Sequence, residues 1–167
     1  GNSIIGNTFR NWGGTESNTG NNATVNIDNQ TKQTGQFSAK NTLVKGNTFV
    51  GNRGAAISLL RTRDTRVENN DISGQKCSSR INISQIDEIG IHIGGRFPMP
   101  DNPDLRAYVA NNTIHDFDPP ENCGLGRATM VGIWADVDVD NGIAEYNRVY
   151  NLGRDDDLKN SWNAAGI

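Results

Sequence analysis

A short phrase that recurs along the chain constrains its fold more than any other feature. Each copy is a brief apolar run, then an asparagine preceded by Gly, Asn or Tyr, then an apolar residue two places on. The copies span residues 4–9, 43–49, 67–72, 109–114 and, more weakly, 144–149. Self-similarity at a period of tens of residues predicts a solenoid.

A second phrase alternates with the first and begins with glycine. Its copies span 54–59, 90–93, 132–137 and 166–167. Apolar and polar residues alternate within both phrases, which indicates strands and not helices. Asparagine suits the bend because it tolerates a left-handed backbone. Equivalent asparagines on stacked strands can also bond to one another in a ladder.

Short strands, asparagine bends and one Gly-Ile start per turn describe a parallel β-helix. On these phrases the chain resembles the right-handed parallel β-helix repeat proteins of the pectate-lyase-like superfamily, over nearly its whole length. The resemblance implies an all-β fold, a right-handed parallel β-helix (solenoid) of about five coils. Because Gly166 opens a strand without a continuation, we expect residues 1–167 to be a single segment that is truncated at both ends, with adjoining coils missing.

The composition agrees with this fold and excludes some partners. Only 34% of the residues are hydrophobic, which suffices for a β-helix because each strand needs one inward row. The formal net charge of −3 argues against nucleic acid or an acidic membrane surface. No apolar run approaches the roughly 18–20 residues of a membrane span.

The spacing of the phrases predicts long loops at one corner. Residues 73–89, 115–131 and 150–165 separate an asparagine phrase from the next glycine phrase, whereas Phe49 and Gly54 need only a tight corner. Stacked loops would form a wall beside the Gly-Ile strand face, and the Pro-containing insertion 96–106 would border its other side. We expect residues 21–42 to be a polar excursion with a short hairpin strand near 24–27; a degenerate coil is the alternative.

The two cysteines fall inside adjacent wall loops. Cys77 and Cys123 would therefore lie within reach of a disulfide, which would place the protein outside the cell or on its surface. Two free thiols in an intracellular protein are the alternative.

Alternation assigns the outward side chains of the Gly-Ile strands. If Ile133 and Ala135 point inward, Trp134, Asp136 and Asp138 point outward. Aligning the glycines places Ala56, His92 and Trp134 in one outward column.

This set suits work on a polysaccharide. Asp136 and Asp138 could supply acid and base or nucleophile, and His92 could transfer protons near neutral pH. Trp134 and Trp162 offer plates for sugar rings. Arg96 and Arg127 could hold a uronate carboxylate.

Metal binding has weaker support. Asp136, Asp138 and Asp140 resemble the start of an EF-hand loop, but Asn141 and Asn147 stand where glycine and glutamate are needed. We expect no cofactor, and calcium on outward aspartates, as in some pectate-lyase-like enzymes, is the alternative.

The predicted function is cleavage of a polysaccharide, by a glycoside hydrolase or a polysaccharide lyase, in a groove on the Gly-Ile strand face. The catalytic phrases of polygalacturonases and pectate lyases are absent, so no catalytic residue is transferred from them. The alternative is a non-catalytic glycan-binding or structural module of the adhesin, stalk or tailspike kind.

Overall fold

The protein, seen in a computed structural model, is built from β-strands. The structure describes residues 1–12, 23–28, 39–76, 85–94, 104–117, 127–135, 139–152 and 163–165. Every regular element within these ranges is a strand, and every strand pair is parallel. The prediction of an all-β fold with parallel strands is therefore confirmed.

Three five-stranded sheets make up the body of the molecule. Sheet A contains β1 (Ser3–Ile5), β4 (Leu43–Lys45), β7 (Arg66–Glu68), β11 (Tyr108–Ala110) and β15 (Ile143–Glu145). Sheet B contains β2 (Thr8–Arg10), β5 (Thr48–Val50), β8 (Asp71–Ser73), β12 (Thr113–Phe117) and β16 (Arg148–Leu152). Sheet C contains β3 (Ala23–Asp28), β6 (Ala55–Leu60), β9 (Gln85–Ile93), β13 (Arg127–Ala135) and β17 (Asn163–Ala165). A two-stranded ribbon pairs β10 (Asp104–Leu105) with β14 (Val139–Asp140).

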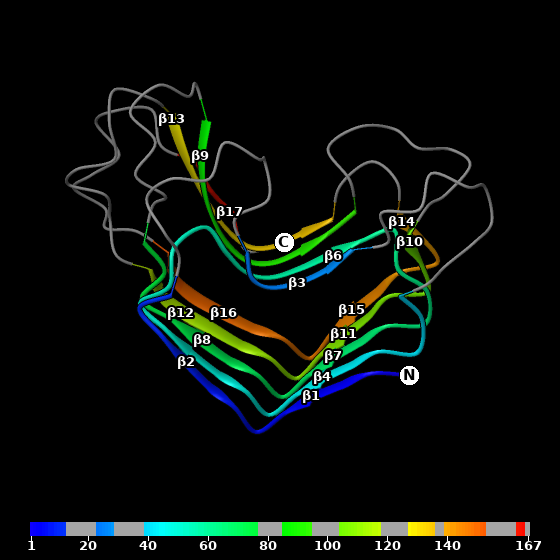
Figure 1. Cartoon of the computed structure of the whole chain (residues 1–167). Helices are drawn as coiled ribbons and strands as arrows, with labels where there is room; N and C mark the ends of the chain where they lie inside the picture. The colour runs from blue at the N-terminus through cyan, green and yellow to red at the C-terminus, as the bar shows by residue number, and fades with distance from the viewer. Residues whose placement is uncertain are drawn as a thin grey trace.

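The chain visits sheets A, B and C in the same order each time. We call three such strands a level, so that β1, β2 and β3 form the first level and β15, β16 and β17 the last. Sheets A and B meet in a V, and sheet C lies across its opening (Figure 1). Each level pairs with the level before and after it, which is why the strand order in every sheet follows the chain.

Apolar columns fill the space between the sheets. Inward residues occupy the same register on successive levels, so that each side chain stacks on its equivalent; the ring centroids of Phe9 and Phe49 lie 4.9 Å apart. Burying each large side chain contributes about 1.5–3 kcal/mol. The fully buried members are Val44, Phe49, Ile57, Leu59, Val67, Ile72, Ile91, Val109 and Ile114.

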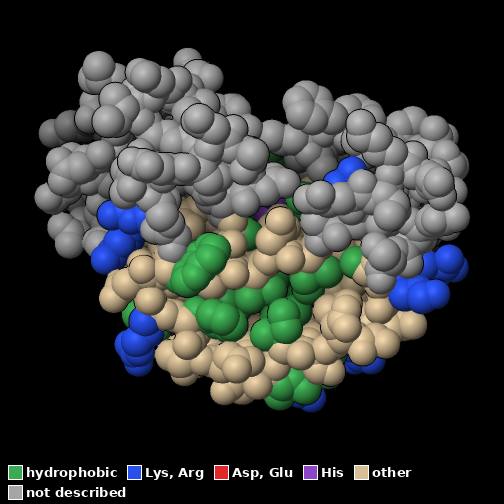
Figure 2. Space-filling view, in the orientation of Figure 1, with side chains coloured by type: hydrophobic (Ala, Val, Ile, Leu, Met, Phe, Trp, Pro, Cys, Tyr) green, Lys and Arg blue, Asp and Glu red, His purple; other side chains and the backbone are tan. Residues whose placement is uncertain are grey.

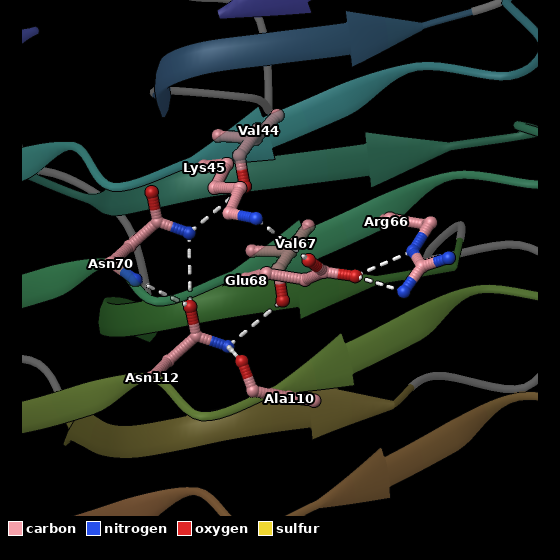
Figure 3. A network of polar contacts seen from close by, with 8 residues as sticks. All are labelled: Val44, Lys45, Arg66, Val67, Glu68, Asn70, Ala110 and Asn112. Carbon is pink, nitrogen blue, oxygen red and sulfur yellow. Dashed lines mark hydrogen bonds and ion pairs between the residues drawn. The ribbon is translucent and has the colours of Figure 1, made fainter. Parts of the chain in front are cut away.

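A ladder of asparagine side chains joins all five levels at the bend between sheets A and B. On the first four levels, Nδ2 donates to Oδ1 of the asparagine on the next level, and that oxygen also accepts the backbone N–H of the donor residue, as Asn70 and Asn112 show (Figure 3). From the second level on, Nδ2 also donates to a carbonyl oxygen of the level before. The members are Asn7, Asn47, Asn70, Asn112 and Asn147, and their Nδ2–Oδ1 distances are 3.1, 3.0, 2.9 and 2.9 Å.

The residue that turns the backbone at this bend is the one before the ladder asparagine. Its φ is positive on every level, whereas the ladder asparagines themselves do not have positive φ. The prediction that the ladder asparagine adopts the left-handed conformation was therefore wrong. The left-handed residue redirects the chain, and the next residue then points its amide inward. The left-handed positions are Gly6, Gly46, Asn69, Asn111 and Tyr146.

Strand β3 corrects the prediction for residues 21–42. A hairpin would be antiparallel, but β3 pairs in parallel with β6, with Val25 opposite Ile57. Val25 is buried in the core cluster. This strand is therefore the sheet C member of the first level. Its polar sequence concealed it because successive side chains of a strand point to opposite faces, and only the inward ones need to be apolar.

Replacing a buried ladder asparagine should destabilise the fold strongly. Asn70→Ala removes the acceptor of the Asn47 backbone N–H and Nδ2 groups and the donor to Val44 O. Each buried group left unpaired costs about 1–3 kcal/mol, so we expect a loss of about 3 kcal/mol or more in the free energy of unfolding, measured with denaturant. The control Asn7→Ala changes an exposed ladder member and should cost less than about 1 kcal/mol. Equal losses would show that the ladder does not hold the levels together.

Tyr146 occupies a conformation that suits its side chain poorly. Its φ is 55°, in the left-handed region, where bulky residues are disfavoured and asparagine is tolerated. Tyr146→Asn, which copies the equivalent Asn69 and Asn111, should raise the free energy of unfolding by about 0.5–1 kcal/mol. A thermal or denaturant melt checks this, and the reverse change Asn111→Tyr should lower stability. An unchanged or lower stability of Tyr146→Asn would contradict the argument.

Candidate functional site

The outward face of sheet C carries one column of side chains that combines a hydroxyl, an imidazole and an indole. Register pairs Asn26 with Ser58, Ser58 with His92, and His92 with Trp134. These residues alternate with the inward core residues of β3, β6, β9 and β13, so they share the outer face. Four successive levels thus contribute one side chain each to the column.

The second-level member of this column is Ser58 and not Ala56, so the expected alignment was wrong there. Ile57 pairs with Ile91, and Ala56 is fully buried in the core. The register therefore places Ala56 opposite Gly90. A Cβ at Gly90 would lie 2.5 Å from Gly132 O and 2.8 Å from a methyl carbon of Ile114. The sequence alignment took Gly54 as the equivalent of Gly90, which shifted this strand by two residues.

The indole of Trp134 and the imidazole of His92 are in contact. Their ring centroids lie 5.6 Å apart, with the planes tilted by 50°. Trp134 also packs against a small apolar cluster of Ala23, Ala55 and Ile89, which fixes its position over the sheet. Both rings are half-buried, so each keeps an accessible part.

Ser58 lies directly beside His92 in the register. Only 2% of Ser58 is exposed, and among the residues that the structure describes its hydroxyl has no hydrogen-bond partner. A buried hydroxyl without a partner costs free energy. The position therefore offers an unsatisfied donor and acceptor next to the histidine.

The structure brings together two of the predicted site residues, His92 and Trp134. Arg127 is the first residue of β13 and pairs with Gln85, at the opposite end of that strand from Trp134. Asp136, Asp138, Arg96 and Trp162 lie outside the described residues, as do Cys77 and Cys123, so their predicted roles stay predictions. The same holds for most of the expected wall loops and for residues 96–103 of the Pro-containing insertion.

A second cluster, which the sequence analysis missed, occupies the outward face of sheet B. Nδ1 of His115 lies 2.7 Å from a carboxylate oxygen of Asp116, and Nε2 lies 2.9 Å from one of Asp71. The ring of Tyr150 stacks on His115 with centroids 5.0 Å apart and an angle of 7°. Arg148 in turn lies 4.7 Å from the centroid of Tyr150. The cluster ties the third, fourth and fifth levels together.

The hydrogen bonds of this cluster require a protonated histidine, because both ring nitrogens then donate. Burial acts to lower the pKa of His115, but the hydrogen bonds with Asp116 and Asp71 outweigh it and raise that pKa above its ordinary value. Hydrogen bonds from Asn151 and then His115 hold the pKa of Asp116 below its usual range. Both shifts favour the charged forms of His115 and Asp116 and so stabilise the ion pair. We call His115, with Asp71, Asp116 and Tyr150, the clamp.

The signal for this cluster was present in the asparagine phrases. His115 and Tyr150 both follow a ladder asparagine by three positions, and the register pairs them. Outward alternation had been applied to the Gly-Ile strands alone. Applied to the asparagine phrases as well, it would have placed these two rings in one column.

Charged side chains on the outward face of sheet A are largely engaged with one another. Arg66 bonds Glu68, and Lys45 lies 3.8 Å from the same carboxylate (Figure 3). Tyr108 donates to Glu145 at 2.7 Å, and this hydrogen bond, with burial, raises the pKa of the phenol. These contacts satisfy the charges locally and leave sheet C as the better candidate for ligand binding.

Across the part of the chain that the structure describes, no helix is long and apolar enough to cross a membrane, and no group of three or more His, Cys, Asp or Glu residues is arranged to hold a metal ion. No protein-family model, curated protein or solved structure matches the chain.

The clamp on sheet B should make stability depend on pH. Because the pKa of His115 is raised, its contribution is complete below the unfolded value of about 6.5 and is lost as the pH rises through the folded value. Because the pKa of Asp116 is lowered, its contribution is present above about pH 3.9 and is lost as the pH falls through the folded value. The free energy of unfolding should therefore be higher near pH 5 than near pH 8.

His115→Gln should reduce this difference in the free energy of unfolding between the two pH values, measured by denaturant titration. His92→Gln is the matched control, because His92 is the other histidine of the chain and belongs to a different sheet. A difference that persists in His115→Gln would mean that the clamp does not titrate in this range.

Proposed function

We propose that the chain is a right-handed parallel β-helix segment of about five coils, of the pectate-lyase-like kind, that binds and cleaves a polysaccharide on the outward face of sheet C. The fold proposal is supported by the constant A, B, C order of parallel strands and by the right-handedness of nearly all parallel crossovers. The functional proposal is carried by one observation, the contact of Trp134 with His92 in a single outward column.

Binding would depend on Trp134. A half-buried indole that is fixed by apolar neighbours on one side offers its remaining surface to a sugar ring at little cost in side-chain entropy. The hydroxyl of Ser58 and the imidazole of His92 supply polar groups beside it. Trp162, Arg127 and Arg96 would extend the binding surface, with the arginines suited to uronate carboxylates.

Cleavage would depend on the two aspartates that follow β13. Asp136 and Asp138 follow in the sequence the strand that carries Trp134, and the proposal assigns the catalytic role to them. A carboxylate pair provides the acid and the base or nucleophile of glycoside hydrolysis. His92, on the neighbouring strand, would transfer protons near neutral pH.

The alternative function is a non-catalytic glycan-binding or structural module. The unbroken asparagine ladder over five levels favours it, because a rigid and regular stack is what a stalk requires. The two functions share the binding face and differ only in turnover. The predicted location, secreted or at the cell surface, applies to both and depends on the predicted Cys77–Cys123 disulfide.

A glycan panel with two variants tests the proposal. Trp134→Ala should weaken binding of the best polysaccharide about tenfold or more, which corresponds to about 1.4 kcal/mol, measured by calorimetry or affinity electrophoresis. Asp136→Asn should keep binding and lose turnover. Tyr146→Ala removes another exposed aromatic ring, 79% exposed, far from sheet C in the fold, and should change neither.

The outcomes separate the functions. Turnover that Asp136→Asn abolishes supports the enzyme, and absorbance of an unsaturated product identifies a lyase instead of a hydrolase. Binding without turnover in the unmodified chain supports the non-catalytic module. If no polysaccharide of the neutral and uronate panel binds, or if Trp134→Ala binds normally, the proposed face is wrong.

A further inference from the structure

Ser58 is a buried polar side chain that lacks the hydrogen bonds of its counterparts in the fold. Apolar side chains gather in the middle of the molecule, inside the outline of the three sheets (Figure 2). The buried asparagines of the ladder bond to one another. Oγ of Ser58 is also buried, but it makes no hydrogen bond among the described residues. Such a hydroxyl lowers stability, so packing alone does not account for it.

Two polar side chains flank Ser58 on the outer face of sheet C, and they differ in burial. Asn26, on the first level, is exposed, so water can bond to its amide. His92, on the third level, is half-buried, and its Nε2 atom is buried. The register pairs His92 directly with Ser58, which sets their Cα atoms about 4.8 Å apart. The buried hydroxyl and the buried ring nitrogen therefore belong to adjacent side chains on one face.

No charged residue takes the place of Ser58 beside His92. On the two neighbouring strands the register puts Ser58 and Trp134 next to the imidazole, and β6 contains no ionisable side chain. The ionisable residues of the other sheet C strands of the first four levels, and of the segment after β13, are Asp28, Asp87, Glu88, Arg127, Asp136 and Asp138. A hydroxyl is thus the polar group that the sheet itself supplies to this ring.

Protonation changes what the buried Nε2 atom requires. Neutral imidazole has one donor and one acceptor nitrogen, whereas both nitrogens donate in the imidazolium. Burial opposes the charged form unless its N–H groups are hydrogen-bonded. The Ser58 hydroxyl has acceptor lone pairs and no existing hydrogen bond to break, so it can turn about χ1 to another staggered rotamer. It is therefore suited to the charged state of His92.

We propose that Ser58 is a positioning residue for His92: its hydroxyl accepts a hydrogen bond from Nε2–H of the protonated ring and so stabilises the imidazolium. Nδ1 is then the nitrogen that takes up and returns a proton, because Nε2 is buried. Ser58 need not touch a ligand, which agrees with its burial. The contact itself is argued from register and burial, and its catalytic consequence rests on the proposed function, in which His92 transfers protons.

An NMR titration of the 167-residue chain tests the contact without any ligand. The chain has two histidines, and the spectrum of His92→Gln shows which imidazole signal belongs to His92. Ser58→Ala should lower the midpoint of the His92 titration by about one pH unit, because the charged ring loses one hydrogen bond. Circular dichroism checks that the variant is folded. Ser58→Cys, which keeps the size of the side chain but is a weak acceptor, replaces Ser58→Ala if that variant unfolds.

Two further variants are the controls. Ser58→Thr keeps a hydroxyl and should restore the midpoint of the unmodified chain. Thr65→Val removes another buried hydroxyl that has no partner among the described residues, directly before β7 in sheet A, and should leave the midpoint unchanged. A midpoint that falls in Thr65→Val as much as in Ser58→Ala would show a general effect of losing a buried hydroxyl and would overturn the proposal.

The same contact predicts that the effect of Ser58→Ala on stability depends on pH. A hydrogen bond to the imidazolium raises the titration midpoint in the folded state. Its contribution is therefore complete below the unfolded value of about 6.5 and is lost as the pH rises through the folded value. Ser58→Ala should lower the free energy of unfolding near pH 5 and leave it unchanged or higher near pH 8. An equal loss at both pH values would contradict the proposal.

The catalytic consequence is tested on the polysaccharide that the glycan panel identifies. Ser58→Ala should shift the limb of the kcat/KM profile that reports His92 to lower pH, by the same amount as the NMR midpoint, and should leave KM nearly unchanged. A merely structural role would change KM and kcat together and leave the limb in place, which would overturn the positioning role.

The results separate this proposal from the proposed function. An unchanged His92 midpoint in folded Ser58→Ala overturns the contact, whether or not a polysaccharide is cleaved. A lowered midpoint in a chain that binds and cleaves no polysaccharide supports the contact, rejects the proposed function and rejects the catalytic consequence with it. A lowered midpoint together with a shifted limb supports both.

Discussion

The structure depends on the asparagine side chain, whose amide hydrogen-bonds to the equivalent asparagine on the next level. Asparagine is able to do this because its amide carries both a donor and an acceptor, so one residue type can repeat without limit. The buried members Asn47, Asn70 and Asn112 satisfy these groups without water. The amides also fix the register, because a slip of one residue would leave several buried polar groups unpaired on every level. The same register brings the apolar residues of successive levels into stacked columns.

The interior and the exterior of the stack follow different rules. Inside, each position repeats a similar side chain, such as Phe49, Ile72 and Ile114 in one column of sheet B. Outside, the register only sets distances, and each level is free to carry a different group. Sheet A uses this freedom for ion pairs, sheet B for the His115 clamp, and sheet C for the column that contains Ser58, His92 and Trp134. The packed core would therefore hold a ligand site on sheet C rigid, and the side chains of that site would not alter the core.

Much of the interior could be predicted from the sequence, because the repeat is a packing requirement and appears directly in the residues. The five asparagines that were identified as equivalent are the five members of the ladder. The errors arose where more than one residue type can adopt the required backbone geometry. The left-handed position accepts Gly, Asn or Tyr146, and the bend in sheet C accepts Gly90 or Ala56, so aligning the glycines shifted one strand.

The candidate site was predictable only in part, for a related reason. Alternation sufficed to place His92 beside Trp134, since both strands run in register. It did not reveal the His115 clamp, because outward residues were sought on one sheet alone. Strand β3 was hidden as well, since its inward row holds only Val25 and Ile27 among polar neighbours. Outward side chains do not repeat from level to level. The register can therefore show where they lie, but a repeat in the sequence cannot show which of them have a function.

The common orientation of the ladder has an electrostatic consequence. The amide dipoles of the five asparagines point the same way and add, as peptide dipoles do along a helix, with the oxygen pole at the first level. Positive charge is favoured near that pole. The described residues of the first two levels include the cationic residues Arg10, Lys40, Lys45 and Arg53. A stack built from aligned amides is thus electrically polar, with partial negative charge toward the first level and partial positive charge toward the last.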